Sequence, residues 1–173
     1  ENLVHGLHAR EIGRANVGIV LGQRHADIER RHPADPLIDF RRRIERYDAD
    51  RNAGTGYPFF VMRARDNVLL GACNLNNVRR GVLQSADIGY WIGSPYVRQG
   101  HTRAAVRRVL AFAFDELRLH RIEAACQPAN TASRTLLEAV GFTHEGLARA
   151  YLNIAGEWRD HERYAILSTD PRS

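Results

Sequence analysis

The spacing of apolar positions changes once, near the middle of the chain. Residues 85–92 alternate in the manner of a strand, and their apolar side chains are Ile88, Tyr90, Trp91 and Ile92. From Thr102 onward the apolar positions fall on one helical face, at Val106, Val109, Leu110, Ala113 and Leu117. Between the two, Gly93-Ser94-Pro95 ends the strand because proline has no N–H to donate to a ladder. The pattern predicts a central strand–loop–helix unit.

The segments before this unit predict one helix and an antiparallel hairpin. The helix begins at Asp35-Pro36, with Asp35 as the N-cap and Pro36 at the first helical position. Residues 59–64 and 68–75 are predicted strands joined by a turn at 65–67, and residues 76–81 form the next turn. Residues 1–34 follow no clear period, although Val17–Leu21 is a short apolar run that fits either a strand or the end of a helix.

The segments after the central unit predict a strand, a short helix and two further strands. In the strand over residues 122–127, one face carries Ile122, Ala124 and Cys126, and the other carries Glu123, Ala125 and Gln127. Asn130 is a suitable N-cap for a helix over Thr131–Val140, and Gly141 suits its left-handed C-terminal stop. Strands follow at residues 142–152 and 161–167, joined by a loop over 153–160. The length suits one domain over residues 1–173.

Composition narrows the class of protein. Apolar residues make up 44% of the chain, but no run reaches the ~18–20 residues that span a bilayer, so no membrane partner is expected. Cys73 and Cys126 lie in apolar segments, which predicts buried thiols and a cytoplasmic location. The histidines show no metal-ligand spacing, so no metal site is expected.

The basic residues are all arginine, and the formal net charge is +5. One explanation is the codon bias of the genome. The other is attraction to an acidic partner, which would allow association with a ribosome through a basic surface. No basic run is interleaved with aromatic residues, so direct readout of nucleic-acid bases is not expected.

The loop that opens the central helix has the geometry of an anion site. The first N–H groups of a helix have no internal partner, and the helix dipole places partial positive charge there. Gly100 lets a bulky phosphate approach the backbone, and Arg98 and Arg103 add formal charge. One glycine before a helix is also common in an ordinary turn, so both interpretations remain open on local physics.

Several spaced motifs over residues 57–167 carry a family resemblance. They are Gly89-Tyr-Trp-Ile-Gly93, Leu119-His-Arg-Ile-Glu-Ala124, Asn130-Thr-Ala-Ser133, Leu136-Leu-Glu-Ala-Val-Gly-Phe142, Glu145-Gly146 and Gly156-Glu-Trp-Arg-Asp-His161. Together with the order of the elements, they resemble the GNAT superfamily of acetyl-CoA-dependent N-acetyltransferases. Within it they resemble the RimJ/RimL branch of ribosomal-protein N-terminal acetyltransferases. The resemblance implies the GNAT acyl-CoA N-acyltransferase fold, an α/β (α+β) architecture in which helices flank a mixed, mostly antiparallel sheet.

The resemblance also implies where acetyl-CoA binds. The pyrophosphate would lie at the loop, and the acetyl group would lie where the central strand and the next one separate. The implied cofactor-binding residues are Trp91, Ile92, Arg98, Gln99, Gly100, His101, Thr102, Arg103 and Asn130. The superfamily loop reads Q/R-x-x-G-x-G/A. Anchored on Gly100, its first position here is Val97 and its last is Thr102, which departs from that pattern.

The implied chemistry needs a proton donor for the departing thiolate and a base for the amine. By resemblance, Ser133 is the proton donor. Asp87 on the central strand is the first candidate base and Glu123 the second, although each could equally be a structural carboxylate paired with an arginine. The glutamate proposed in the RimL branch falls near Leu152 here. Of the histidines, only His161 is a candidate to line the acceptor slot.

The predicted function is transfer of the acetyl group of acetyl-CoA to a protein N-terminus, such as the N-terminal alanine of a ribosomal protein. The loop over 153–160, tied by Trp158, would then close one side of a slot for an extended peptide. An acetyltransferase for a small amine, such as an antibiotic or a polyamine, is the first alternative. A catalytically silent acyl-CoA-binding module is the second. A strongly acidic pocket would favour a polycationic amine, and a narrow slot would favour a peptide.

Overall fold

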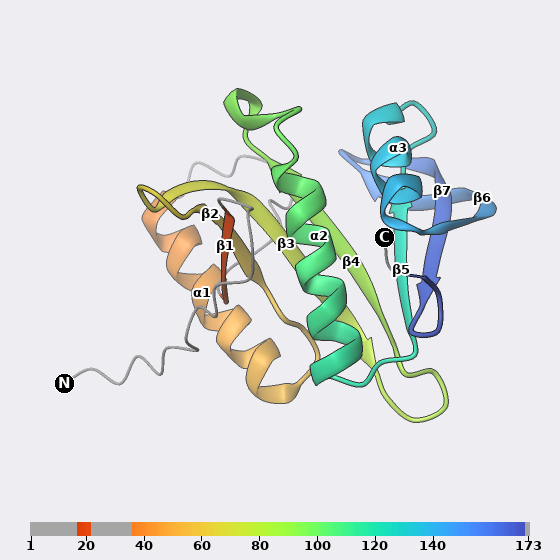
Figure 1. Ribbon diagram of the computed structural model, residues 1–173, viewed down its shortest axis with the longest axis horizontal. Helices are drawn as coiled ribbons and strands as arrows, with labels where there is room; N and C mark the ends of the chain where they lie inside the picture. The colour runs from red at the N-terminus through yellow and green to blue at the C-terminus, as the bar shows by residue number, and fades with distance from the viewer. Residues whose placement is uncertain (1–16, 22–35, 172–173) are drawn as a thin grey trace.

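The computed structural model describes residues 17–21 and 36–171 (Figure 1). Within these residues, seven strands form one sheet in the order β1-β2-β3-β4-β5-β7-β6. The strands are β1 (Val17–Leu21), β2 (Phe59–Arg63), β3 (Val68–Arg79), β4 (Ser85–Ile92), β5 (Arg121–Cys126), β6 (Thr143–Ile154) and β7 (Glu157–Leu167). Every neighbouring pair is antiparallel except β4 and β5, which are parallel. The prediction of a mixed, mostly antiparallel sheet is confirmed, and the Val17–Leu21 run is a strand.

Three α-helices flank the sheet in the described part of the chain. They are α1 (Pro36–Ala53), α2 (His101–Ala111) and α3 (Thr131–Val140). A 3-10 turn, η1 (Ser94–Tyr96), precedes α2, and a π-helical turn, η2 (Phe112–Glu116), continues it. None of these helices is long and apolar enough to cross a bilayer. Asp35, the predicted N-cap of the first helix, lies outside the described residues.

The apolar face of α2 packs against the sheet as its spacing predicts. Val106, Val109, Leu110 and Ala113 are buried, and Leu117 is partly buried against the same core. From β5 the core takes Ile122, Ala124 and Cys126, which confirms the predicted alternation of that strand. Cys73 and Cys126 are both buried free thiols, as predicted.

The ladder between β4 and β5 is short. It joins only Ser85 to Arg121, Ala86 to Ile122 and Asp87 to Glu123 in the described residues. Beyond Asp87 the two strands diverge toward the end that carries α3 (Figure 1), and β5 continues its pairing with β7 alone. Backbone groups alternate sides along a strand, so the groups of residues 88–92 on the β5 side have no ladder partner.

Two predicted connections were wrong. The turn over residues 76–81 is not one, because β3 runs to Arg79 through a register irregularity that contains Asn77 at φ 49°. The loop over residues 153–160 is instead a hairpin, since β6 ends at Ile154 and β7 begins at Glu157. Ala155 and Gly156 form its two-residue turn, with φ values of 54° and 90°. Two successive positive φ angles match the twist of the flanking strands.

Gly71 generates a prediction about stability. A Cβ at this position in β3 would lie 2.1 Å from the Trp91 carbonyl oxygen of β4, and Gly71 has no positive φ angle. We expect Gly71→Ala to lower the free energy of unfolding by about 3 kcal/mol or more, because the strands must move apart. Urea unfolding curves measure the loss.

The control is Gly81→Ala, where a Cβ meets nothing within 4 Å but φ is +69°. That substitution should cost only the ~1–2 kcal/mol of a left-handed residue. Equal losses in the two variants would contradict the steric explanation.

Candidate active site

A cleft opens where β4 and β5 diverge. Its volume is about 580 Å³, and its walls come from β4, β5, β7 and the start of α3. The polar side chains in its lining are those of Tyr90, Gln127, Asn130, Ser133 and His161, together with the thiol of Cys126. The sequence placed Ser133 and Asn130 at this position, and the structure brings both to the same wall.

The first turn of α3 orients Ser133. The Asn130 side chain caps the helix by accepting a hydrogen bond from the Ser133 backbone N–H at 3.0 Å, as expected for an asparagine N-cap. The Ser133 hydroxyl lies 2.7 Å from the Tyr90 hydroxyl of β4. Burial raises the pKa of Tyr90, so its phenol stays protonated. The cleft therefore contains two linked hydroxyl groups that carry protons.

Tyr90 was not singled out from the sequence as a functional residue. Its place in an apolar alternation gave the signal of a core residue, and it does pack partly against the core. Its contact with Ser133 joins positions 43 residues apart, which no local pattern reveals.

The backbone of the loop before α2 is not covered at Gly100 by any side chain that the structure describes. Gly100 is the N-cap at φ 79°, no side chain caps the helix, and a Cβ on Gly100 would meet nothing within 4 Å. Arg98, at φ 60°, is exposed beside it. Gln99 closes the loop by donating to the Pro95 carbonyl at 3.1 Å, and its other amide atom lies 3.3 Å from His101 Nε2. The geometry is that of a backbone anion site.

The other predicted cofactor contacts occupy different places. Arg103 donates to the Ala139 carbonyl of α3 at 3.1 Å, and so joins the two helices. Thr102 is partly buried in the first turn of α2. At the end of β4, Trp91 is 38% exposed and Ile92 packs partly against the core.

A second depression of about 400 Å³ adjoins the gap between β4 and β5. Its charged and aromatic lining includes Asp50, Asp87, Glu123, Tyr151 and Arg163. It shares Ile88, Gly89, Ala124 and Ala125 with the cleft. We call this depression the slot. Because the two spaces share the edges of the diverging strands, a group in the cleft and a group in the slot can meet between β4 and β5.

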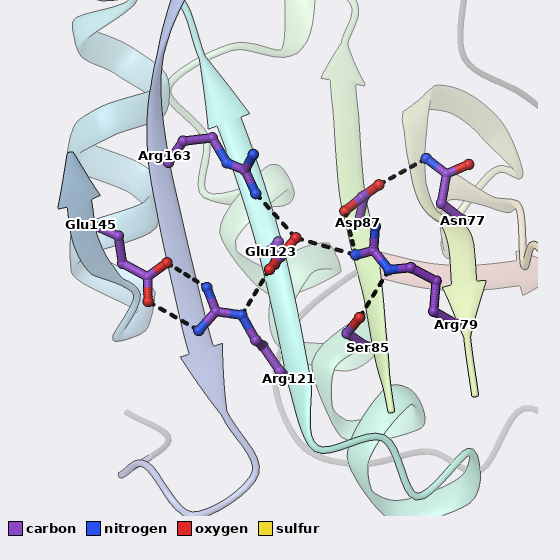
Figure 2. Close-up of polar contacts among 8 residues, drawn as sticks. All are labelled: Asn77, Arg79, Ser85, Asp87, Arg121, Glu123, Glu145 and Arg163. Atoms are coloured by element: carbon purple, nitrogen blue, oxygen red, sulfur yellow. Dashed lines mark hydrogen bonds and ion pairs between the residues drawn. The ribbon is translucent and has the colours of Figure 1, made fainter. Parts of the chain in front are cut away.

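Two carboxylates of the slot, those of Asp87 and Glu123, are engaged by donors (Figure 2). Arg79 lies 3.0 Å from Asp87 Oδ1, and Asn77 donates to Asp87 Oδ2 at 2.7 Å. Glu123 contacts Arg79 at 3.1 Å, Arg121 at 2.8 Å and Arg163 at 3.0 Å. These contacts fit the alternative of paired structural carboxylates, and the catalytic role of Asp87 stays a prediction.

The charges of this network balance. Arg121 also forms a two-bond ion pair with Glu145, so three guanidinium groups face the three carboxylates of Asp87, Glu123 and Glu145. Burial acts to raise the pKa of Glu123, but the arginines outweigh it and hold that pKa below its usual range. A carboxylate held ionised in this way is a weak base.

A bulge in β6 shapes the far wall of the slot. The register shifts between Ala148 and Leu152, and Ala150 adopts φ 46° while its N–H donates to Asp160 Oδ1 at 2.7 Å. Tyr151 and Leu152 consequently line the slot, and the Arg163 guanidinium lies 4.7 Å from the Tyr151 ring centre. Bulges commonly redirect side chains beside functional sites.

The expectation that Trp158 ties a loop across the slot was wrong. Trp158 lies in β7, pairs with Asn153 across the hairpin, and is 65% exposed. Its backbone is held by the strand ladder, so no loop over residues 153–160 exists to close the slot.

The remaining histidines differ in position. His120 is exposed, and its backbone bonds Gln84 and Ser168 at the start of β5. His161 is buried, with 4% of its surface exposed, and lines the cleft.

The family model and the relatives that match this chain are all described as acetyltransferases. Residues 8–143 match the model described as "Acetyltransferase (GNAT) domain". "Probable N-acetyltransferase YjcK" of Bacillus subtilis (strain 168) is 42% identical over 75% of this chain and 72% of its own length. The ribosomal protein uS5-alanine N-acetyltransferase of Escherichia coli (strain K12) is 32% identical over 68% of this chain, and the match spans only 60% of that protein.

Two solved structures extend the comparison. Mycobacterium smegmatis RimJ in complex with CoA-disulfide is 41% identical, with a TM-score of 0.66 over 69% of this chain and 56% of that chain. A variant of spermidine N-acetyltransferase SpeG from Vibrio cholerae is 27% identical, with a TM-score of 0.64 over 72% of this chain and 73% of that chain. The similar proteins thus differ in the amine named for them.

The arginine network predicts a pH-dependent stability. We expect Glu123→Gln to lower the free energy of unfolding at pH 7 by about 1–3 kcal/mol, because three guanidinium groups lose a charged partner. The folded-state pKa of Glu123 is lowered, so its contribution is present above the unfolded carboxyl pKa of about 4.3 and is lost as the pH falls below it. Urea unfolding from pH 7 to pH 3 should show the two proteins converging.

Glu116→Gln is the matched control, since Glu116 is an exposed carboxylate on η2. Its stability should stay within about 0.5 kcal/mol of the wild type at each pH. A Glu123→Gln difference that does not change with pH would contradict the assigned electrostatic role.

Proposed function

The chain belongs to the GNAT acetyltransferase family, and from that membership we propose that it transfers the acetyl group of acetyl-CoA to the N-terminal amine of a protein. The favoured acceptor is the N-terminal alanine of a ribosomal protein, the group named for the Escherichia coli relative. The net charge of +5 would favour approach to the ribosome, and two buried free thiols suit a cytoplasmic location.

The cleft and the loop fit acetyl-CoA. The uncapped first turn of α2 offers backbone N–H groups to the pyrophosphate, and the open space at Gly100 permits its close approach. The residues at that loop are Arg98, Gln99 and His101. Thr102 and Arg103 follow in the first turn of α2, where Arg103 bonds to the Ala139 carbonyl of α3. Asn130 lies in the wall of the cleft. When bound, acetyl-CoA supplies a thioester carbonyl, which the unpaired backbone N–H groups near Trp91 and Ile92 would polarise.

Ser133 supplies the proton that the departing thiolate needs. Its hydroxyl lies in the cleft and contacts the Tyr90 phenol, which stays protonated and can return a proton to it. On the amine side, Asp87 attracts the incoming ammonium, which gives its first proton to water. An α-amino group has an ordinary pKa of about 7.7–8.0, so this first loss is easy near neutral pH.

The ion pairing of Asp87 and Glu123 carries the choice of acceptor. A polyamine needs several uncompensated carboxylates at intervals, whereas Asp87 and Glu123 already face Arg79, Arg121 and Arg163. Among the residues that line the slot, this leaves Asp50 as the single carboxylate outside the arginine network. A single α-amine followed by an uncharged alanine needs no such array. A polyamine remains the second candidate acceptor, because a spermidine N-acetyltransferase shares the fold at 27% identity.

Mass spectrometry on a peptide with a free N-terminal alanine and one internal lysine tests the acceptor. We expect acetylation of the α-amine and none on a matched peptide whose N-terminus is blocked. Spermidine is assayed in parallel.

Acetyl found mainly on the lysine would refute the proposal. Turnover of spermidine without turnover of either peptide would establish the polyamine alternative. Acetyl-CoA binding without turnover of any amine would indicate a silent acyl-CoA-binding module.

The role of Ser133 predicts a selective kinetic defect. We expect Ser133→Ala to reduce kcat by about 10²–10⁴-fold while acetyl-CoA affinity changes little, because a proton donor acts mainly in the transition state. Steady-state kinetics and calorimetry measure the two quantities. Thr135→Ala, an exposed hydroxyl on the same helix, should behave as wild type. A near-normal kcat in Ser133→Ala would leave Ser133 as a helix-cap residue only.

A further inference from the structure

His161 is a buried polar residue that the mechanism above does not use. It belongs to β7, with Ala148 of β6 as its pairing partner, and only 4% of its surface is exposed. Despite this burial it lines the cleft that contains Ser133 and Tyr90. A buried imidazole that reaches a candidate reaction space calls for a chemical explanation.

One hydrogen bond fixes which nitrogen of the ring carries hydrogen. His161 Nδ1 lies 3.0 Å from the Arg159 carbonyl oxygen, and a carbonyl oxygen can only accept. Nδ1 therefore donates, and in the neutral ring Nε2 has a lone pair. Within the described residues this is the hydrogen bond that the ring makes. The Tyr151 ring packs edge-on at 5.8 Å between centres and holds the ring plane.

The charged groups around His161 are engaged elsewhere. On β7, Arg159 pairs with Glu157, Asp160 accepts from the Ala150 N–H, and Glu162 contacts His144. Arg163 pairs with Glu123 and lies over the Tyr151 ring. Across the cleft, β4, β5 and α3 present the Tyr90 phenol, the Cys126 thiol and the Ser133 hydroxyl. His161 is thus a base with a fixed orientation, and no carboxylate within residues 17–21 and 36–171 is bound to it.

From this geometry we infer that His161 Nε2 accepts the proton that the acceptor amine loses as its nitrogen bonds to the acetyl carbon. The inference rests on the proposed acetyl transfer but not on the identity of the amine. The amine arrives as an ammonium and gives its first proton to water beside Asp87. The N–C bond then forms, the second proton passes to Nε2, and the C–S bond breaks.

The proton balance closes without a further reactant. Ser133 protonates the sulfur, and the imidazolium returns its proton to solvent, from which the Ser133–Tyr90 pair is replenished. The products are an acetamide, free CoA thiol and one released proton. His161 suits the second step better than Asp87 or Glu123, since guanidinium groups already occupy both of those carboxylates.

Two substitutions separate this role from a structural one. His161→Asn keeps an N–H near the position of Nδ1 for the Arg159 carbonyl but removes Nε2. His161→Ala removes the ring and leaves room for added imidazole. His120→Asn is the matched control, because His120 is an exposed histidine on the neighbouring strand segment.

We expect kcat in His161→Asn and His161→Ala to fall by about 10²–10⁴-fold, with acetyl-CoA affinity by calorimetry little changed. Added imidazole should raise the turnover of His161→Ala but not that of His161→Asn. His120→Asn should match wild type. Turnover of His161→Asn within about threefold of wild type would overturn the inference, since that variant retains the structural hydrogen bond.

A second measurement does not depend on the acceptor. ¹⁵N NMR of the full chain with histidine labelled, at a pH where the ring is neutral, reports the tautomer of His161 directly. We expect hydrogen on Nδ1 and none on Nε2, and the opposite tautomer would overturn the inference. If wild type fails on the peptide but acetylates another amine, the proposed acceptor fails while the His161 variants are assayed with that amine. If it acetylates none, the proposed transfer fails and the role of His161 fails with it, and the tautomer then reports only which ring nitrogen carries hydrogen.

Discussion

The early end of the β4–β5 ladder is the constraint on which the rest of the structure depends. Three residue pairs hold the two strands together, and after Asp87 and Glu123 they separate. Every residue of β5 pairs with β7 in an antiparallel ladder, so β5 remains a regular strand where it separates from β4. Backbone polar groups along the gap must find partners outside the sheet. The cleft, the slot and the unpaired backbone groups near Trp91 are all consequences of this one interruption.

Patterns that depend on local chemistry were predicted from the sequence. The central strand–loop–helix unit follows from a change of period and a proline, and the start of α3 follows from an asparagine cap. The β6–β7 hairpin was missed because its turn puts Ala155 in a left-handed conformation, which local preference disfavours. Pairing along two long strands outweighs that cost. Tyr90 escaped notice because its partner Ser133 is distant in sequence.

The roles of the carboxylates were beyond prediction for a related reason. Asp87 and Glu123 were assigned to the correct strands, but the sequence did not show which side chains contact their carboxylates. Arg79 answers it by contacting both carboxylates at once, from a strand that was expected to have ended before it. A planar guanidinium can bridge two acids with separate N–H groups, which a lysine ammonium does less well. The arginine-only composition therefore has a structural use at this position.

The bond from Arg103 to the Ala139 carbonyl joins the start of α2 to the end of α3. These are the positive end of one helix dipole and the negative end of another, with a cation between them. Helix α2 begins at the loop that can hold a pyrophosphate, and helix α3 carries Ser133. The distance between the loop before α2 and the Ser133 hydroxyl is therefore set when the chain folds. A ligand that reaches from one to the other must match a length that the protein has already fixed.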